Sequence, residues 1–141
     1  MSEKTKMAIA RRAVACPGWR WMPGMRATWP DDGRPARRYG SPGETAGWIS
    51  DYSGKERSIF DAHALPDFDD PATLGCLLAL VRETYGHKNT YAGPVYDYGH
   101  WSIWRCRTWK EDVIGRRTLT FDGPTEAEAL VAALEAAGGA G

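Results

Sequence analysis

Histidine and cysteine are the side chains that combine zinc binding with catalysis as general base or nucleophile, and the chain contains six of them. They are three histidines and three cysteines: His63, His87, His100, Cys16, Cys76 and Cys106. No two cysteines are spaced as C-x-x-C, and no histidine lies at ligand spacing from another histidine or a cysteine. The sequence therefore predicts neither a zinc site nor a redox motif. We expect no catalytic residue, no metal and no cofactor.

A second group with chemical potential is acidic. Asp67, Asp69 and Asp70 stand just before a predicted helix. They lack the alternating ligands and closing Glu of a calcium loop. We therefore expect them to cap the helix and to interact favourably with the positive end of its dipole. The chain also contains no G-x-x-x-x-G-K-S/T phosphate loop and no G-x-S-x-G nucleophile motif in a strand–turn–helix context. These absences favour a protein that is not an enzyme.

The helix behind this acidic group is predicted from Pro71 to Tyr85. Asp70 suits the N-cap, Pro71 suits the first helical position, and Gly86 is a stop signal. Gly75 weakens the helix interior, which predicts a close neighbour at that point. An apolar stripe follows helical spacing through Leu74, Leu77, Leu78, Val81 and Tyr85.

A second helix is predicted to begin at a capping box formed by Thr125 and Glu128 and to end at Gly138-Gly139. Its apolar face consists of Ala127, Leu130, Val131 and Leu134. The first fourteen residues fit either a short helix or a frayed terminus.

Strand patterns occur in two pairs. Residues 100–109 and 117–121 predict an antiparallel pair with a turn at 110–115, and residues 48–52 and 57–60 predict a shorter hairpin. The proline-rich and glycine-rich segment 29–47 predicts a long irregular surface loop. From the residues alone we expect one α+β domain over 1–141, with a disordered tail at 138–141. It would be a small antiparallel sheet of about three to five strands with two amphipathic helices packed on one face.

The charges are unevenly distributed although the formal net charge is zero. Residues 1–57 carry +5 and residues 58–141 carry −5, so either the halves attract each other within one fold or the first half presents a basic partner-binding face. We name Arg20, Arg37 and Arg38 as candidate partner-binding residues. Trp19 and Trp21 flank Arg20, and the sequence leaves open whether they are core or surface residues.

The predicted pair of strands at 100–109 and 117–121 is also rich in arginine. Its strands would place four arginines on one sheet face, which would suit phosphate, an acidic protein surface or plain solvation. They are Arg105, Arg107, Arg116 and Arg117. No apolar run is long enough to cross a bilayer and no secretory signal is visible, which predicts a protein of a reducing cytoplasm.

Three strings carry a resemblance: ACPGWRWMPGMRATWP at 15–30, ALPDFDDPATLGCLLALVRETYG at 64–86 and GPTEAEALVAALEAA at 123–137. Together they resemble a group of small proteins encoded by tailed bacteriophages and prophages. The resemblance implies a phage accessory protein in the host bacterial cytoplasm, and it supplies no catalytic residue. It further implies binding of a host protein or ribonucleoprotein complex, with anti-CRISPR-like inhibition of a host defence complex as one such role. The alternative is a nucleic-acid-associated phage factor.

Overall fold

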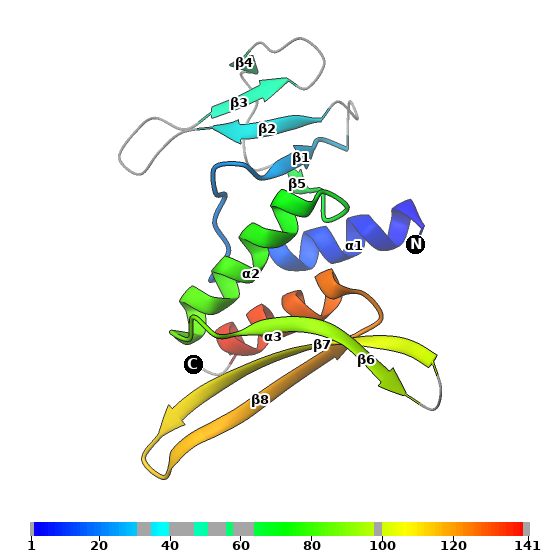
Figure 1. The fold of residues 1–141 in the computed structure, drawn as a ribbon. Helices are drawn as coiled ribbons and strands as arrows, with labels where there is room; N and C mark the ends of the chain where they lie inside the picture. The colour runs from blue at the N-terminus through cyan, green and yellow to red at the C-terminus, as the bar shows by residue number, and fades with distance from the viewer. Residues whose placement is uncertain are drawn as a thin grey trace. The chain divides into compact units, whose positions relative to one another are not determined.

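The structure, a computed structural model, describes residues 2–30, 35–39, 47–50, 56–57, 64–97 and 100–139. Its contacts group into two compact units. Unit 1 comprises residues 1–14 and 20–76, and unit 2 comprises residues 15–19 and 77–141. The predicted α+β class is confirmed, but the expectation of one sheet and two helices is wrong, because the described residues form two sheets and three helices (Figure 1).

Unit 1 contains helix α1 (Glu3–Val14) and a five-stranded antiparallel sheet in the order β4-β3-β2-β1-β5. Of the two alternatives for the first fourteen residues, a short helix or a frayed terminus, the structure shows the helix. It buries Ile9, Ala10 and Ala13. The strands are β1 (Arg26–Thr28), β2 (Ala36–Tyr39), β3 (Gly47–Ser50), β4 (Glu56–Arg57) and β5 (Leu65–Pro66).

The segment 29–47, expected as an irregular surface loop, is partly regular and partly buried. Strand β2 lies inside it and pairs with β1 and β3. Trp29 and Ala36 are buried in a small cluster with Ala27 and Ala64, against which Trp21 packs. The sequence pattern missed β2 because the strand has only four residues, too few to show a period. Residues 31–34 and 40–46 of the expected loop lie outside the described part.

Helix α2 (Pro71–Tyr85) has the predicted bounds, and both of its ends show the reason. At the start, the Thr73 amide donates to Asp70 Oδ2 at 3.0 Å. At the end, Gly86 has a φ of 72°, and the His87 amide donates to the Arg82 carbonyl at 3.0 Å, a Schellman closure. The cap and the stop are local signals, which is why the sequence predicts them well.

The buried side of α2 differs from the predicted stripe by one position. Thr73, Leu77, Leu80 and Val81 are almost wholly buried. Leu74, Leu78 and Tyr85 are only partly buried, although the pattern placed them in the stripe. Residues 77–81 are five consecutive leucine, alanine or valine residues, so the sequence pattern does not fix the rotation of the helix about its axis.

Unit 2 is a three-stranded antiparallel sheet, β6-β7-β8, with helix α3 (Glu126–Gly139) packed on one of its faces. The strands are β6 (Tyr91–Asp97), β7 (His100–Asp112) and β8 (Gly115–Gly123). The expected pairing of residues 100–109 with 117–121 is confirmed, and the two strands continue to Asp112 and Gly115. Strand β6 was not predicted, because Gly93 and Pro94 interrupt its pattern; such residues are tolerated on an edge strand.

Helix α3 presents its predicted apolar face to this sheet. Ala127, Leu130, Val131 and Leu134 are all less than 8% exposed. Thr125 caps the helix as expected, because the Glu128 amide donates to Thr125 Oγ1 at 3.2 Å, and the Thr125 hydroxyl in turn donates to Glu128 Oε2 at 3.3 Å. The helix continues through Gly139, so part of the segment expected as a disordered tail is helical.

Candidate functional site

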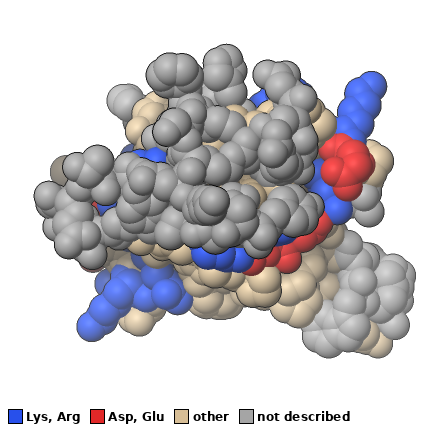
Figure 2. All heavy atoms as spheres, turned by 90° about the horizontal axis from the view of Figure 1, so that it is seen from above, with Lys and Arg blue, Asp and Glu red and all other residues tan. Residues whose placement is uncertain are grey.

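The acidic residues before α2 form ion pairs with basic side chains of unit 1. Arg26 Nη1 lies 2.7 Å from Asp67 Oδ2, and Lys6 Nζ contacts Asp69. Each pair joins a residue of the basic first half of the chain to a carboxylate of the acidic second half. Figure 2 shows blue and red side chains in direct contact with one another. The charge asymmetry of the sequence therefore contributes to contacts within the fold.

Of the three predicted partner-binding residues, Arg37 has an intramolecular role. Its guanidinium contacts both carboxylate oxygens of Asp70 at 3.0 Å and donates to the Gly24 carbonyl at 2.7 Å. Arg38 is half-buried in β2, and its amide donates to the Met25 carbonyl at 2.8 Å. Arg20 is exposed. The three arginines are thus in three different environments, and Arg20 has the most accessible side chain.

The two indoles beside Arg20 belong to different units, Trp19 to unit 2 and Trp21 to unit 1. Both are partly buried, so neither is a simple core or surface residue. Trp21 packs against the Trp29 cluster. The choice that the sequence left open, core or surface, therefore has an intermediate answer for both indoles.

The cysteines carry no sign of activation. Burial raises the pKa of the Cys106 thiol to about 11, and burial together with the charge of Asp70 raises the pKa of the Cys76 thiol. Cys16 is 7% exposed. A reactive cysteine needs a lowered pKa and access, so these thiols fit packing roles. Among the histidines, His87 lies edge-on to Trp109 at 6.0 Å, while the side chains of His63 and His100 lie outside the described part.

The two faces of the β6-β7-β8 sheet differ sharply. Successive residues of a strand alternate between faces, and cross-strand partners share a face. Cys106 and Thr108 are buried on the α3 side, so Arg105 and Arg107 lie on the opposite side. Arg116 is the cross-strand partner of Glu111 and shares that opposite face.

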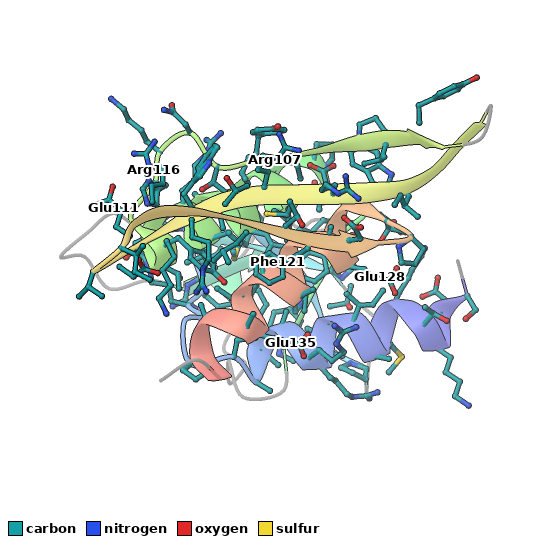
Figure 3. All side chains as sticks on the ribbon, turned by 90° about the horizontal axis from the view of Figure 1, so that it is seen from below. Arg107, Glu111, Arg116, Phe121, Glu128 and Glu135 are labelled. Atoms are coloured by element: carbon teal, nitrogen blue, oxygen red, sulfur yellow. The ribbon has the colours of Figure 1, made fainter. Side chains whose placement is uncertain are left out.

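Arg117 departs from the expected set of four. Its cross-strand partner is Lys110, so it lies on the α3 side of the sheet. Three of the four predicted arginines therefore share one face, and the fourth belongs to the other. Figure 3 shows Glu111 and Arg116 close together at the end of the hairpin and Phe121 on the side of α3.

We call the side of the sheet opposite α3 the outer face. It combines arginine with aromatic residues and carboxylates. Arg105 makes a two-point ion pair with Asp122, with distances of 2.7 and 3.0 Å. Arg116 lies 6.0 Å from the Trp109 ring and 3.5 Å from Glu111 Oε1. Arg107 is half-buried, and its Nε donates to no acceptor in the described part of the chain.

The β7–β8 hairpin ends in an exposed apolar tip. Val113 and Ile114 connect the last paired residues, Asp112 and Gly115, and are 104% and 93% exposed. Asp112 Oδ1 accepts a hydrogen bond from the Ile114 amide at 2.9 Å, and Gly115 has a φ of 128°. Short hairpin loops normally consist of Asn, Asp and Gly. Two β-branched apolar residues here therefore depart from turn chemistry.

The hairpin tip was not among the predicted site residues, although a sequence signal for it exists. Val113 and Ile114 stand inside the predicted turn 110–115, where apolar residues gain nothing from burial. The described part of the chain has four large hydrophobic residues with high exposure, and all belong to the sheet of unit 2. They are Tyr91, Tyr96, Val113 and Ile114.

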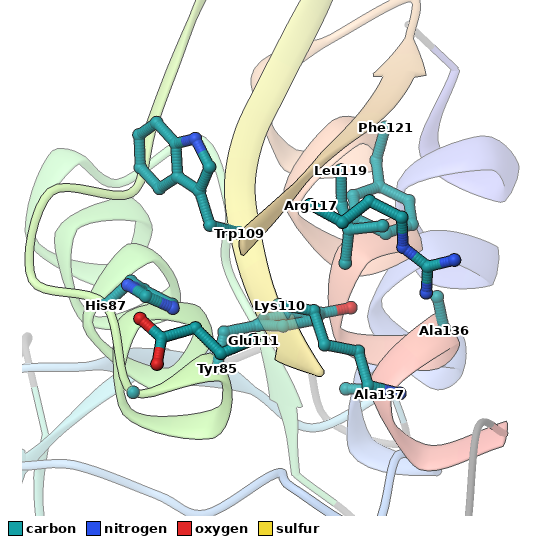
Figure 4. Close-up of a pocket in the computed structure, with 11 residues that line it drawn as sticks. Tyr85, His87, Trp109, Lys110, Glu111, Arg117, Leu119, Phe121, Ala136 and Ala137 are labelled. Atoms are coloured by element: carbon teal, nitrogen blue, oxygen red, sulfur yellow. The ribbon is translucent and has the colours of Figure 1, made fainter. Parts of the chain in front are cut away.

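Unit 2 also contains a pocket with a volume of about 600 Å³ (Figure 4). Leu119 and Phe121 of β8 and Tyr85 at the end of α2 supply apolar surface. The Tyr85 ring lies 6.2 Å from the Phe121 ring, and its hydroxyl donates to the Ala133 carbonyl at 2.7 Å. The remaining lining residues are Gly86, His87, Trp109, Lys110, Glu111, Arg117, Ala136 and Ala137.

No protein-family model, curated protein or solved structure matches the chain. Within the described ranges, no three His, Cys, Asp or Glu residues are grouped so that they could hold a metal ion. Among the helices that the structure describes, none is long and apolar enough to cross a membrane.

Proposed function

We propose that this protein is a non-enzymatic, phage-type accessory protein that binds a host protein through the β7–β8 hairpin. The observation that carries the proposal is the tip formed by Val113 and Ile114. Two fully exposed β-branched residues in a short turn contribute nothing to the core of this chain. A local departure from turn chemistry of this kind is expected at functional sites.

The surroundings of the tip resemble the layout of a protein interface. Apolar residues at the centre of such interfaces are enclosed by a polar rim. Exposed charged residues of both signs flank the tip on β7 and β8 and supply such a rim. They are Lys110, Glu111, Asp112, Arg116 and Arg117. The partner we expect has an apolar cavity for the tip and carboxylates that meet Arg116 and its neighbours.

The charge pattern favours a protein over a nucleic acid as the partner. Asp122 and Glu111 lie beside Arg105 and Arg116 on the outer face, and carboxylates in these positions would repel phosphates. The exposed apolar tip adds nothing to phosphate binding. Host-protein binding agrees with the resemblance of the three sequence strings to phage accessory proteins. Within this proposal, inhibition of a host defence complex is the first biological role to test.

The experiment is affinity purification of the tagged protein from infected host cells, with quantitative mass spectrometry of the captured proteins. The test variant is Val113→Ser combined with Ile114→Ser. Exposed substitutions usually change the free energy of unfolding by no more than about 0.5 kcal/mol, so circular dichroism should show an unchanged fold. The comparison variant is Arg20→Glu, which probes the site that the sequence analysis favoured.

We expect one host protein or complex to be enriched by the parent and by Arg20→Glu, and to fall at least tenfold with the tip variant. Nuclease treatment of the lysate should not reduce this capture. Loss with Arg20→Glu alone, or no enriched host protein, would overturn the proposal. Capture that disappears after nuclease treatment and falls steeply with salt would favour the nucleic-acid-associated factor instead.

A further inference from the structure

The pocket of unit 2 is bordered by two cations that face each other across the hairpin. Lys110 of β7 and Arg117 of β8 are directly opposite cross-strand partners. Like charges in this relationship destabilise a strand pair. The neighbouring pairs on the outer face, Arg105 with Asp122 and Arg116 with Glu111, have opposite signs. The pair at the pocket is therefore the one pair of like charges among the β7–β8 partners.

No ion pair or side-chain hydrogen bond within the described residues compensates these two charges. Glu111 also lines the pocket, but its carboxylate pairs with Arg116 at 3.5 Å and not with Lys110 or Arg117. Figure 4 shows Lys110 and Arg117 extending toward Ala136 and Ala137 in the last turns of α3. The negative end of a helix carries about half an elementary charge, which offsets only part of two full positive charges. A net positive charge remains at the pocket.

The rest of the lining is mainly apolar. Leu119, Phe121 and Tyr85 are partly buried, and the two alanines of α3 add small side chains. A volume of about 600 Å³ lies within the range of pockets that hold small organic ligands, and such pockets combine an apolar lining with a few polar groups that orient the ligand.

We propose that this pocket binds a small aromatic carboxylate, with its ring against Leu119, Phe121 and Tyr85 and its carboxylate between Lys110 and Arg117. Arg and Lys make charge-assisted hydrogen bonds to carboxylates, and an anion here would remove the repulsion between them. Lys110, Glu111 and Arg117 line the pocket and also belong to the charged rim beside the hairpin tip, so the pocket adjoins the proposed partner surface without including Val113 or Ile114. It does not depend on the proposed host partner.

Isothermal titration calorimetry with 2-naphthoate tests the proposal, and the neutral 2-naphthylmethanol is the matched ligand control. The test variant is Lys110→Gln combined with Arg117→Gln. The matched protein control is Arg20→Gln combined with Arg105→Gln, which removes two cations that do not line the pocket. We expect the test variant to raise the Kd for 2-naphthoate at least tenfold and to leave the Kd for the alcohol within twofold.

The control variant should bind both ligands as the parent does. Ala136→Trp, an exposed position on α3 that faces the pocket, should abolish binding of both. The melting temperature of the unliganded test variant should not fall, because the substitution removes like-charge repulsion. Failure of the parent to bind 2-naphthoate at millimolar concentration would overturn the site. Equal losses in the test and control variants would mean that net charge, not the pocket, attracts the anion.

Discussion

Arg37 and Asp70 join strand β2 to the first turn of α2 through a two-point ion pair, with Nη1–Oδ2 and Nη2–Oδ1 distances of 3.0 Å each. The same carboxylate accepts hydrogen bonds from the amide and the hydroxyl of Thr73, at 3.0 and 2.8 Å. Asp70 therefore serves as helix cap and sheet anchor together. This relationship explains why an arginine expected to bind a partner is used within unit 1.

Replacing this carboxylate should destabilise the protein. Asp70→Asn keeps an N-cap side chain but leaves the partly buried Arg37 without its counter-charge, which we expect to cost about 1–3 kcal/mol. The control is Asp122→Asn, which removes the more exposed pair with Arg105 and should cost less than about 1 kcal/mol. Urea denaturation measures both values. Equal costs for the two variants would show that the Arg37 pair has no special structural role.

The same site predicts an acid-sensitive contribution to stability. The hydrogen bond from Arg37, aided by those from Thr73, lowers the pKa of Asp70 from 3.8 to about 2. A carboxyl group whose pKa is lower in the folded state stabilises the fold above its unfolded pKa. That contribution is lost as the pH falls toward the folded pKa. We therefore expect the stability difference between the parent and Asp70→Asn to shrink by about 2 kcal/mol between pH 5 and pH 2. A difference that stays constant over this range would contradict the assignment.

Gly75 should be replaceable with a gain in stability. The sequence predicted a close neighbour for this helix glycine, but a Cβ atom built at Gly75 meets nothing within 4 Å. Gly75→Ala should raise the free energy of unfolding by roughly 0.5–1 kcal/mol, because alanine restricts the unfolded chain and favours the helix. Gly123→Ala is the opposite case, since its Cβ would lie 2.8 Å from the Ala129 backbone nitrogen. Gly123→Ala should lower the free energy of unfolding by about 1–3 kcal/mol. The melting temperatures of the two variants, ranked against the parent, check both predictions.

The buried hydroxyls of Thr90 and Thr108 should show strong coupling. Their oxygens lie 2.7 Å apart, and both residues are 0% exposed. Thr108→Val alone leaves one buried hydroxyl without this partner, at a cost of about 1–3 kcal/mol. The double replacement Thr90→Val with Thr108→Val removes both hydroxyls and should be closer to the parent than either single variant. A double-mutant cycle measured by denaturation decides this, and purely additive losses would contradict it.

Local features of the sequence were sufficient for the helices of the second half and for the main hairpin. Asp70, Pro71 and Gly86 determine the ends of α2 through capping and backbone conformation, and Thr125 does so at the start of α3. The period-two pattern of residues 100–109 and 117–121 gives the β7–β8 pairing. Each of these signals acts over a few residues or across one short turn, so it can be read without knowing the rest of the chain.

Tertiary structure decided what joins residues far apart in the sequence. In unit 1, Arg26 pairs with Asp67 and Arg37 with Asp70 across sequence separations of 41 and 33 residues. The rotation of α2 about its axis, which buries Leu80, depends on the elements that pack against the helix. The helical period of the sequence carries no information about those elements. Strand alternation alone puts Arg116 and Arg117 on different faces, but only the register of the hairpin places Lys110 opposite Arg117 at the pocket. Binding sites of this kind arise from long-range packing, because the residues that form them have no shared local pattern.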